Sequence, residues 1–273
     1  MSKIKNKKTY RSIARETRFS VKNKISLFFE LLGECFIIIL SVLKYIFRGK
    51  VNIKDVINQM YFMGVESLPI VLITVAFSSA VIALYLAQII TGWGLGSYTG
   101  TVTGLSITRE IAPVLCGVIL SARVASSIGA EIGSMKVTEQ IDALKTLSVD
   151  PIEYLIVPKV IGAVLMLPLV CIIADIVGVW AGYVVAGANG VSGGGFMAAC
   201  QAFTKMTDIT NGMIKCLFYG LVVSVVGSQQ GLRTSGGAVG VGEATTNSVV
   251  ISIVSVYVLN FFLTFLMFGG KEY

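Results

Sequence analysis

The sequence predicts an all-α membrane protein with five transmembrane helices, and three observations support this fold class. Of the 273 residues, 55% are hydrophobic and 14% are charged, and the mean hydropathy is +0.81, whereas a soluble domain carries charges on roughly a quarter of its residues. Apolar runs of about 20 residues, each long enough to cross the hydrocarbon core, recur along the chain. Because lipid-exposed backbone must satisfy its hydrogen bonds internally, each run is expected to be a helix.

The N-terminal segment holds most of the excess positive charge, which totals +7 over the chain. Residues 1–24 are too polar to insert, so we expect a basic cytoplasmic tail that is either partly helical against anionic headgroups or disordered. Residues 25–54 are expected to form an interfacial or elbow helix followed by a basic linker. Glu30, Glu34 and Lys44 interrupt their apolar run, and charges at the bilayer centre are costly.

Residues 55–273 are expected to form one membrane domain. Its five spans are predicted at residues 63–90, 107–128, 156–185, 213–229 and 249–268. The third is longer than a bilayer requires, so it should tilt or project from the membrane. Two glycine-rich runs lack the strand–turn–helix context of a phosphate-binding loop. GWGLG from Gly92 is expected to be a tight outer turn, and GGAVGVG from Gly236 a flexible cytoplasmic loop.

The charges of the connecting segments orient the predicted bundle. The N-terminal segment, residues 129–159 and residues 231–246 all carry Lys or Arg, whereas residues 91–106 carry no charge. The positive-inside rule therefore places the N-terminus in the cytoplasm. With five spans, the C-terminus lies on the opposite face. Lys205 is an exception, because it falls in a segment that this topology places outside.

Small residues recur at four-residue spacing in two places, which allows helix backbones to approach closely. The pattern suits either packing within one subunit or a seam between two copies. The two stripes are Ser121, Ala125, Gly129 and Gly133, and Gly178, Gly182 and Ala186.

Catalytic and metal-binding chemistry finds little support. Histidine is absent, which removes the commonest metal ligand and the commonest general base at neutral pH. The five cysteines are scattered, mostly within apolar runs and without a C-x-x-C pair, so they are interpreted as packing residues. We therefore expect a transporter subunit that is not itself an enzyme and holds no metal.

A polar interruption at residues 131–151, EIGSMKVTEQIDALKTLSVDP, lies between the second and third spans on the predicted cytoplasmic side. A short amphipathic helix is predicted over residues 131–147, because its apolar residues fall near one face at helical spacing. Asp150 and Pro151 should end it. Such a helix could lie on the membrane surface or in the groove of a partner protein. The apolar residues are Met135, Ile141, Leu144 and Leu147.

The surrounding run, RVASSIGAEIGSMKVTEQIDALKTLSVDPIEYLIVP from Arg123 to Pro158, resembles the signature of the MlaE family of ABC transporter permeases. The upstream run TREIAPVLCGVILSAR and the later run GEATTNSVV from Gly242 fit the same family. The similarity covers roughly residues 57–269, and the pattern E-x-G-x-M-x-V-T-E-Q-I-D-A-L within it is long and specific.

The resemblance implies an MlaE-type permease domain at residues 55–273, in a homodimer of the inner membrane that binds a cytoplasmic ATPase on one side and an MCE-domain lipid carrier on the other. Members move lipids, with phospholipid as the expected cargo here, between the inner membrane and an outer membrane or envelope. The sequence contains no G-x-x-x-x-G-K-[ST], so ATP and Mg²⁺ should belong to the partner chain. No cofactor in this chain and no nucleic acid partner are expected. The residues that match the family's ATPase-coupling helix are Glu131, Met135, Thr138, Glu139, Gln140, Asp142 and Leu144.

Arg109, Glu110 and Lys215 open the second and fourth spans, so they should lie at similar depth near the outer face. They could be interfacial anchors whose charged ends reach the headgroups. MlaE-family members resemble this arrangement, with charged residues at matching positions near the lipid cavity. A carboxylate between two cations could hold the helix ends together or receive a polar headgroup.

Asp175 lies deep in the third span, where a carboxylate is either functional or internally satisfied. Proton coupling is one interpretation. The favoured one is a hydrogen bond to a neighbouring helix, for example to Ser or Thr, because the sequence offers no second buried carboxylate or histidine as a relay. Two other functions stay open: an autonomous secondary transporter in which Asp175 or Glu110 binds a proton, and a non-transporting membrane scaffold.

Overall fold

The computed structural model describes residues 26, 29–49 and 51–269, and within this part every regular element is a helix. Five helical runs are long and apolar enough to cross a membrane, so the all-α membrane class and the five predicted spans are confirmed. Each run extends beyond its predicted limits at one end or both. The runs are Ile53–Gly92, Gly96–Val137, Ile152–Ala188, Met206–Leu232 and Gly237–Phe268.

Short π-helical segments divide the first three runs into the labelled helices. The first run consists of α2 (Ile53–Met60), the π-helical η1 (Tyr61–Val65) and α3 (Leu68–Gly92). The second contains the 3₁₀ turn η2 (Gly96–Tyr98), α4 (Thr99–Ser106), π-helical η3 (Ile107–Ile111), α5 (Ala112–Leu120), π-helical η4 (Ser121–Ala125) and α6 (Ser126–Val137). The third contains π-helical η5 (Ile152–Ile156) and α8 (Val157–Ala188).

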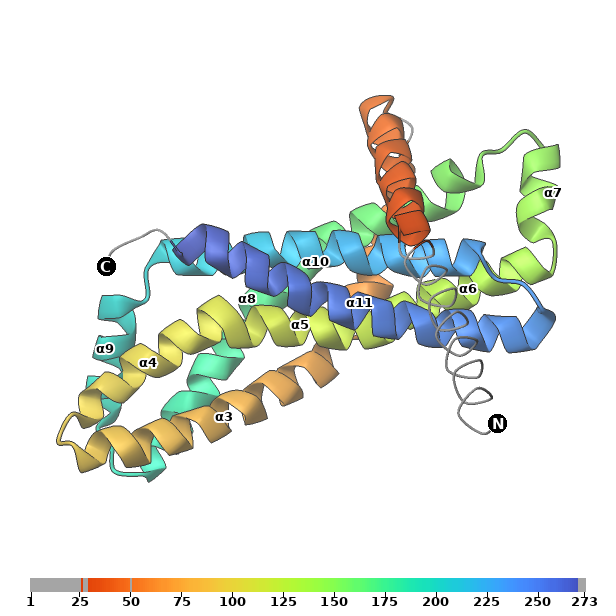
Figure 1. Cartoon of the computed structure of the whole chain (residues 1–273). Helices are drawn as coiled ribbons and strands as arrows, with labels where there is room; N and C mark the ends of the chain where they lie inside the picture. Colours follow the sequence, from red (N-terminus) through yellow and green to blue (C-terminus); the bar gives the residue numbers. More distant parts are fainter. Residues whose placement is uncertain (1–25, 27–28, 50, 270–273) are drawn as a thin grey trace, which may run out of the picture.

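The remaining helices are α7 (Gln140–Thr146), α9 (Gly193–Phe203), α10 (Met206–Leu232) and α11 (Gly237–Phe268). Figure 1 shows the long helices as one bundle with α7 at one end and α9 at the other. Helix α8 packs against both α3 and α10, and α11 packs on α10 and α6. These ends are called the α7 end and the α9 end below.

Residues 29–47 form a helix that runs across the direction of the bundle (Figure 1). It is not among the five candidate spans found in the described residues, and the interfacial position predicted for it stays a prediction. Its two acidic residues, Glu30 and Glu34, both pair with Arg233 at the end of α10, at 2.9 and 3.5 Å. These ion pairs compensate two of the three charges that interrupt the apolar run. The basic tail predicted at residues 1–24 lies outside the described residues.

Both small-residue stripes pack within the subunit. A Cβ at Gly129 would come 2.5 Å from Ser248 Oγ of α11, and one at Gly178 would come 2.9 Å from Ser79 Oγ of α3. Helices α8 and α10 touch even more closely, because a Cβ at Gly220 would come 2.7 Å from the backbone oxygen of Ala163. The small residues therefore set the spacing of the core helices.

The single helix predicted over residues 131–147 is wrong. Its first part is the end of α6, continuous with the second span, and the chain then breaks at Thr138 and Glu139 before α7 begins. Glu139 adopts a left-handed conformation (φ 60°), which reverses the chain so that Ile141 of α7 can be buried. The Thr138 hydroxyl donates back to Ser134 O at 2.8 Å, a bond of the kind that slightly destabilises a helix and often bends it.

The loop predicted from Gly236 is also wrong, whereas the turn predicted from Gly92 is found. Only residues 233–236 separate α10 from α11, and the GGAVGVG run forms the first turns of α11. Gly236 and Gly237 supply the positive φ angles of this short connection. At the other end of the bundle, Gly94 (φ 76°) turns the chain between α3 and η2.

Candidate functional site

The π-helical segment η3 places Arg109 and Glu110 inside the second span. Pro113 follows at the start of α5, and because proline has no N–H it cannot donate to the carbonyl four residues earlier. That carbonyl belongs to Arg109, and it accepts a hydrogen bond from Lys215 Nζ at 2.7 Å instead. A proline in the second span thus prepares a binding position for a lysine of the fourth.

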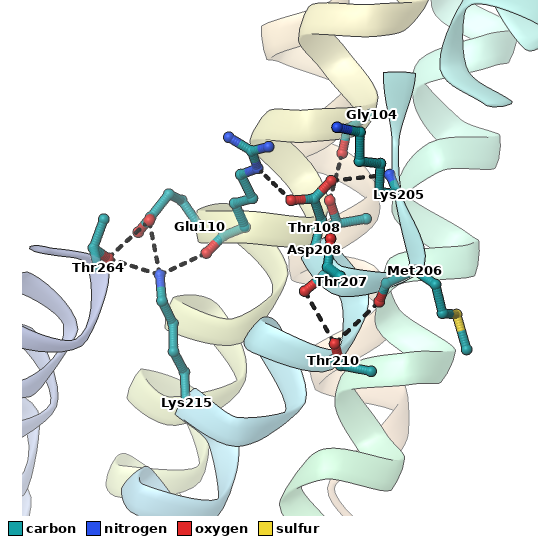
Figure 2. A network of polar contacts seen from close by, with 11 residues as sticks. Gly104, Thr108, Glu110, Lys205, Met206, Thr207, Asp208, Thr210, Lys215 and Thr264 are labelled. Atoms are coloured by element: carbon teal, nitrogen blue, oxygen red, sulfur yellow. Dashed lines mark hydrogen bonds and ion pairs between the residues drawn. The ribbon is translucent and has the colours of Figure 1, made fainter. Parts of the chain in front are cut away.

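Lys215 is completely buried, yet all three of its ammonium donors are used. Besides Arg109 O, Nζ donates to Glu110 Oε1 and to Thr264 Oγ1, each at 2.7 Å (Figure 2). Thr264 in turn donates to Glu110 Oε1 at 2.9 Å, and Asn260 Nδ2 donates to Glu110 Oε2 at 2.9 Å. Three helical segments, η3, α10 and α11, are joined through this one carboxylate.

Arg109 points to a different acidic partner. Its Nε lies 2.9 Å from Asp208 Oδ1, and its guanidinium lies 4.7 Å from the ring centroid of Phe268. The other carboxylate oxygen of Asp208 accepts the backbone N–H of Lys205 at 2.9 Å, which caps the start of α10. The Lys215 network is defined here as Arg109, Glu110, Asp208, Lys215, Asn260 and Thr264.

The three charged residues predicted to lie together do so, but the structure adds partners that the sequence analysis missed. Asp208 could have been suspected, because it stands three residues after the N-terminal cap of the fourth span. Asn260 and Thr264 are four residues apart in an apolar span, which places them on one helix face. The anchor interpretation fails for Lys215, because a side chain with no exposed surface does not reach the headgroups.

A pocket of about 450 Å³ adjoins the Lys215 network on the surface of α11. Its polar edge is formed by Glu110, Asn260 and Thr264. Its other walls are aromatic, contributed by Tyr257, Phe261, Phe265 and Phe268. An amphipathic molecule could place apolar chains against these rings and a polar group at the network.

The predicted coupling residues divide into a set that contacts other helices of the bundle and a set that lies exposed at the α7 end. Glu131 lies on α6, where it pairs with the buried Lys159 of α8 at 2.6 Å. Met135 and Leu144 pack against the hydrophobic core, so the apolar face of this region is turned inward, although Leu147 is 73% exposed. The exposed set at the α7 end is defined as the α7 surface and consists of Thr138, Glu139, Gln140 and Asp142.

The charged side chains of the α7 surface are solvated, and the hydrogen bonds between them and nearby lysines are long. Asp142 accepts hydrogen bonds from Lys145 at 3.0 Å and from Lys136 at 3.4 Å. These two contacts, that of Lys145 first, hold the pKa of the Asp142 carboxyl below its ordinary value. Glu139 is exposed beside it at the left-handed start of α7.

Asp175 does not make the hydrogen bond that was predicted for it. The residue is 6% exposed, and neither carboxylate oxygen has a hydrogen-bond partner among the described residues. The predicted contact to a Ser or Thr of a neighbouring helix is therefore wrong. In the same described part of the chain, no three His, Cys, Asp or Glu side chains are grouped to hold a metal ion.

Comparison with known proteins shows which family the chain is similar to. The family model described as Permease MlaE matches residues 56–266. A probable ABC transporter permease protein of Synechocystis sp. is 40% identical over 250 residues, covering 91% of this chain and 95% of its own length. A probable ABC transporter permease protein of Rickettsia typhi is 39% identical over 214 residues, which cover 78% of this chain and 83% of the relative. Protein TRIGALACTOSYLDIACYLGLYCEROL 1, chloroplastic, of Arabidopsis thaliana is 34% identical over 231 residues, which cover 84% of this chain and 66% of the relative.

Proposed function

The chain belongs to the MlaE family of ABC transporter permeases, and from this premise we propose that it moves lipid, with phospholipid as the cargo, between the inner membrane and the outer membrane or envelope. A relative is named for trigalactosyldiacylglycerol, which is itself a lipid. A lipid cargo accords with a chain that offers apolar surface and few polar binding groups.

One observation carries the lipid proposal, and it is the pocket beside the Lys215 network. Its volume of about 450 Å³ is within the range of small-molecule sites. Aromatic rings supply apolar area without specific hydrogen bonds, which suits acyl chains. Glu110, Asn260 and Thr264 present polar atoms at one edge only, which suits a headgroup.

The test removes aromatic area from the pocket while leaving the Lys215 network intact. The double variant Phe261→Ala/Phe265→Ala should retain about tenfold less phospholipid after purification, because a loss of about 1.4 kcal/mol of apolar contact corresponds to a factor of ten in affinity, and this is less than the full burial of one ring contributes. Mass spectrometry of the bound lipid and transfer between vesicles are the measurements. Phe262→Ala/Leu266→Ala is the matched control, since both residues are exposed on α11 but do not line the pocket. Equal loss in both variants would refute the pocket.

The proposal assigns the α7 surface to a separate cytoplasmic ATPase that binds ATP and Mg²⁺. The α7 end then faces the cytoplasm, and the end of α11 lies on the opposite face with α9, where an MCE-domain lipid carrier would bind. Exposed polar residues at a chain reversal are accessible to a partner, whereas the apolar face of α7 is already packed against the core. A second copy of the chain is the proposed partner within the membrane, since the most apolar window of α11 is only 11% buried.

Charge reversal tests the ATPase contact. Glu139→Lys should abolish copurification with the ATPase while the permease stays folded in the membrane, because Glu139 is exposed and makes no ion pair with any residue that the structure describes. Glu243→Lys is the matched control, with an exposed carboxylate on the first turns of α11 at the same end of the bundle. Normal copurification of the Glu139→Lys variant would overturn the assignment of the α7 surface.

A further inference from the structure

The carboxylate of Glu110 has an acceptor position that its neighbours do not fill. A carboxylate offers about four such positions on its two oxygens. Oε1 accepts hydrogen bonds from Lys215 and Thr264, whereas Oε2 accepts one, from Asn260, among the described residues (Figure 2). The Glu110 side chain is 40% exposed and lines the pocket. A position on Oε2 is therefore open to a ligand in the pocket.

The neighbours of Glu110 determine which kind of group can use this position. Tyr219 donates its hydroxyl to Asn260 Oδ1 at 2.8 Å, which turns the amide nitrogen of Asn260 toward Glu110. Lys215 Nζ lies 2.7 Å from Oε1, and an ammonium at this distance favours the ionised carboxylate, which can only accept. A ligand that binds at Oε2 must therefore be a hydrogen-bond donor, and one with a positive charge binds more strongly.

The cations of the Lys215 network are turned away from the pocket. Lys215 has no exposed surface, and its three donors are used within the network. Arg109 Nε bonds to Asp208, and the guanidinium lies over the ring of Phe268, which is itself a wall of the pocket. Of the described residues, those that line the pocket include no Lys or Arg. The charge that the described lining presents to a ligand is therefore negative.

The aromatic walls favour the same sign of ligand charge. Tyr257, Phe261, Phe265 and Phe268 line the pocket beside Glu110. The face of an aromatic ring carries partial negative charge and attracts cations, and the attraction is stronger where water is excluded. The carboxylate and the rings are independent features of the pocket, and both favour a cationic group.

We propose that this pocket selects phospholipids whose headgroup carries an ammonium, such as phosphatidylethanolamine, over phospholipids with an anionic headgroup, such as phosphatidylglycerol. The ammonium donates one N–H to Glu110 Oε2 and has two more donors, so it can also bond to the phosphate of its own lipid. An anionic headgroup has no such cation and brings its phosphate toward a like charge, which lowers its affinity. The inference rests on the proposed function, because it requires phospholipid in this pocket.

Competition between two lipids tests the selection. The full-length protein is purified from nanodiscs that contain equal amounts of phosphatidylethanolamine and phosphatidylglycerol with the same acyl chains, and the retained lipids are measured by mass spectrometry. Pocket-bound lipid is the amount that the wild type retains beyond Phe261→Ala/Phe265→Ala. In this fraction phosphatidylethanolamine should exceed phosphatidylglycerol about tenfold, because a hydrogen bond to a charged group commonly contributes at least one factor of ten in affinity.

The two proposals fail in different ways. Equal amounts of the two lipids in the pocket-bound fraction would overturn the headgroup selection and leave the lipid pocket standing. Equal total lipid in the wild type and in the Phe261→Ala/Phe265→Ala variant would overturn the pocket, and the headgroup selection with it.

A second variant tests whether Glu110 is the selecting residue. Glu110→Gln/Lys215→Met removes both charges of the pair, so it avoids the unpaired buried ammonium that Glu110→Gln alone would leave. The ratio of the two retained lipids should fall to that of the supplied mixture, and a ratio does not depend on how much lipid is retained. A variant that keeps the wild-type ratio would overturn the role of Glu110.

The matched control is Glu131→Gln/Lys159→Met. This is also a pair of a buried lysine with a half-exposed glutamate, 2.6 Å apart, but neither residue lines the pocket. The control should keep the wild-type preference for phosphatidylethanolamine. An equal loss of preference in both double variants would overturn the assignment to Glu110, because it would show that the ratio follows the removal of any such pair.

Discussion

The two polar regions of the molecule, the Lys215 network and the α7 surface, hold their charges in opposite ways. In the network the side chain of Lys215 has no exposed surface and that of Asp208 is 4% exposed, and each lies within 2.9 Å of its partner. On the α7 surface the side chain of Asp142 is 51% exposed and its two lysine partners are 3.0 and 3.4 Å away.

This difference decides how a mutation in each region can be interpreted. A buried ion pair contributes little net stability when intact, but removing one partner leaves a charge without compensation. An exposed pair is worth little in either case. Loss of transport after a change in the Lys215 network can therefore result from unfolding, whereas loss of function after a change on the α7 surface indicates a lost contact.

The largest effect is expected for Glu110→Gln. This change leaves the buried Lys215 without its counterion and should lower the free energy of unfolding in mild detergent by about 3 kcal/mol, the low end for buried pairs because Glu110 is itself 40% exposed. The double variant Glu110→Gln/Lys215→Met should recover most of this loss, since no unpaired charge remains. A single variant as stable as the wild type would show that the network is not a buried ion pair.

A smaller effect is expected for Glu131→Gln. The ion pair of Glu131 with Lys159 joins one buried and one exposed side chain, so it is intermediate between the pairs of the two regions. Lys159 is 3% exposed and depends on Glu131, but Glu131 is 49% exposed, so we expect a loss of about 1–2 kcal/mol in thermal or chemical unfolding. Glu243→Gln removes an exposed carboxylate at the same end of the bundle and is the control. If the two variants lose equal stability, the Lys159 pair does not stabilise the start of α8.

A gain in stability is expected for Glu139→Gly. Glu139 has a φ of 60°, which costs a residue with a side chain more than it costs glycine, so the free energy of unfolding should rise by about 0.4–1 kcal/mol. ATPase copurification should fall in the same variant, because the carboxylate is lost. Ser148→Gly, at the other left-handed residue beside α7, should give the gain without the loss of binding. A Glu139→Gly protein less stable than the wild type would contradict the inference that the left-handed conformation of Glu139 is strained.

The smallest effect is expected for the pH dependence of the Asp142 pairs. The pKa of Asp142 is lowered in the folded protein, so its contribution to stability is present above its ordinary pKa of about 3.9 and is lost as the pH falls through the lowered folded pKa. Carbon-detected NMR titration of labelled Asp should show this lowered midpoint in the wild type. The midpoint should return toward the ordinary value in Lys145→Met or at about 1 M salt. An unchanged midpoint in both conditions would mean that the lysines are not its cause.

Hydropathy predicted the number and order of the spans, because the bilayer imposes one length and one composition on every crossing. It did not predict their ends, since α11 begins at Gly237 within a glycine run whose helical state depends on packing against α6. The same limit applies to the break at Glu139, because a left-handed glutamate has no local signal and results from the burial of Ile141 beyond it.

The candidate site was predictable where charge alone identified a residue, as for Arg109, Glu110 and Lys215. The pairing was not, because the register of three helices determines that Arg109 meets Asp208 while Glu110 meets Lys215. Asp175 shows the opposite limit. Its sequence position identified a buried acid, but a partner was assumed from general experience of buried polar groups, and the packing of α3 on α8 supplies none among the described residues.

The contacts of the helix of residues 29–47 also constrain the order in which the parts of the protein fold. Glu34 accepts a hydrogen bond from Gln229 at 2.7 Å, and the two are 195 residues apart. At about 5–20 residues per second, the ribosome needs on the order of 10 to 40 s to synthesise the intervening chain. During this interval Glu30 and Glu34 have been synthesised but Arg233 has not. The first helix therefore exists for that time without the ion pairs that these two carboxylates make in the folded protein. Its docking is therefore a late event in biogenesis, completed only after the fourth span has emerged.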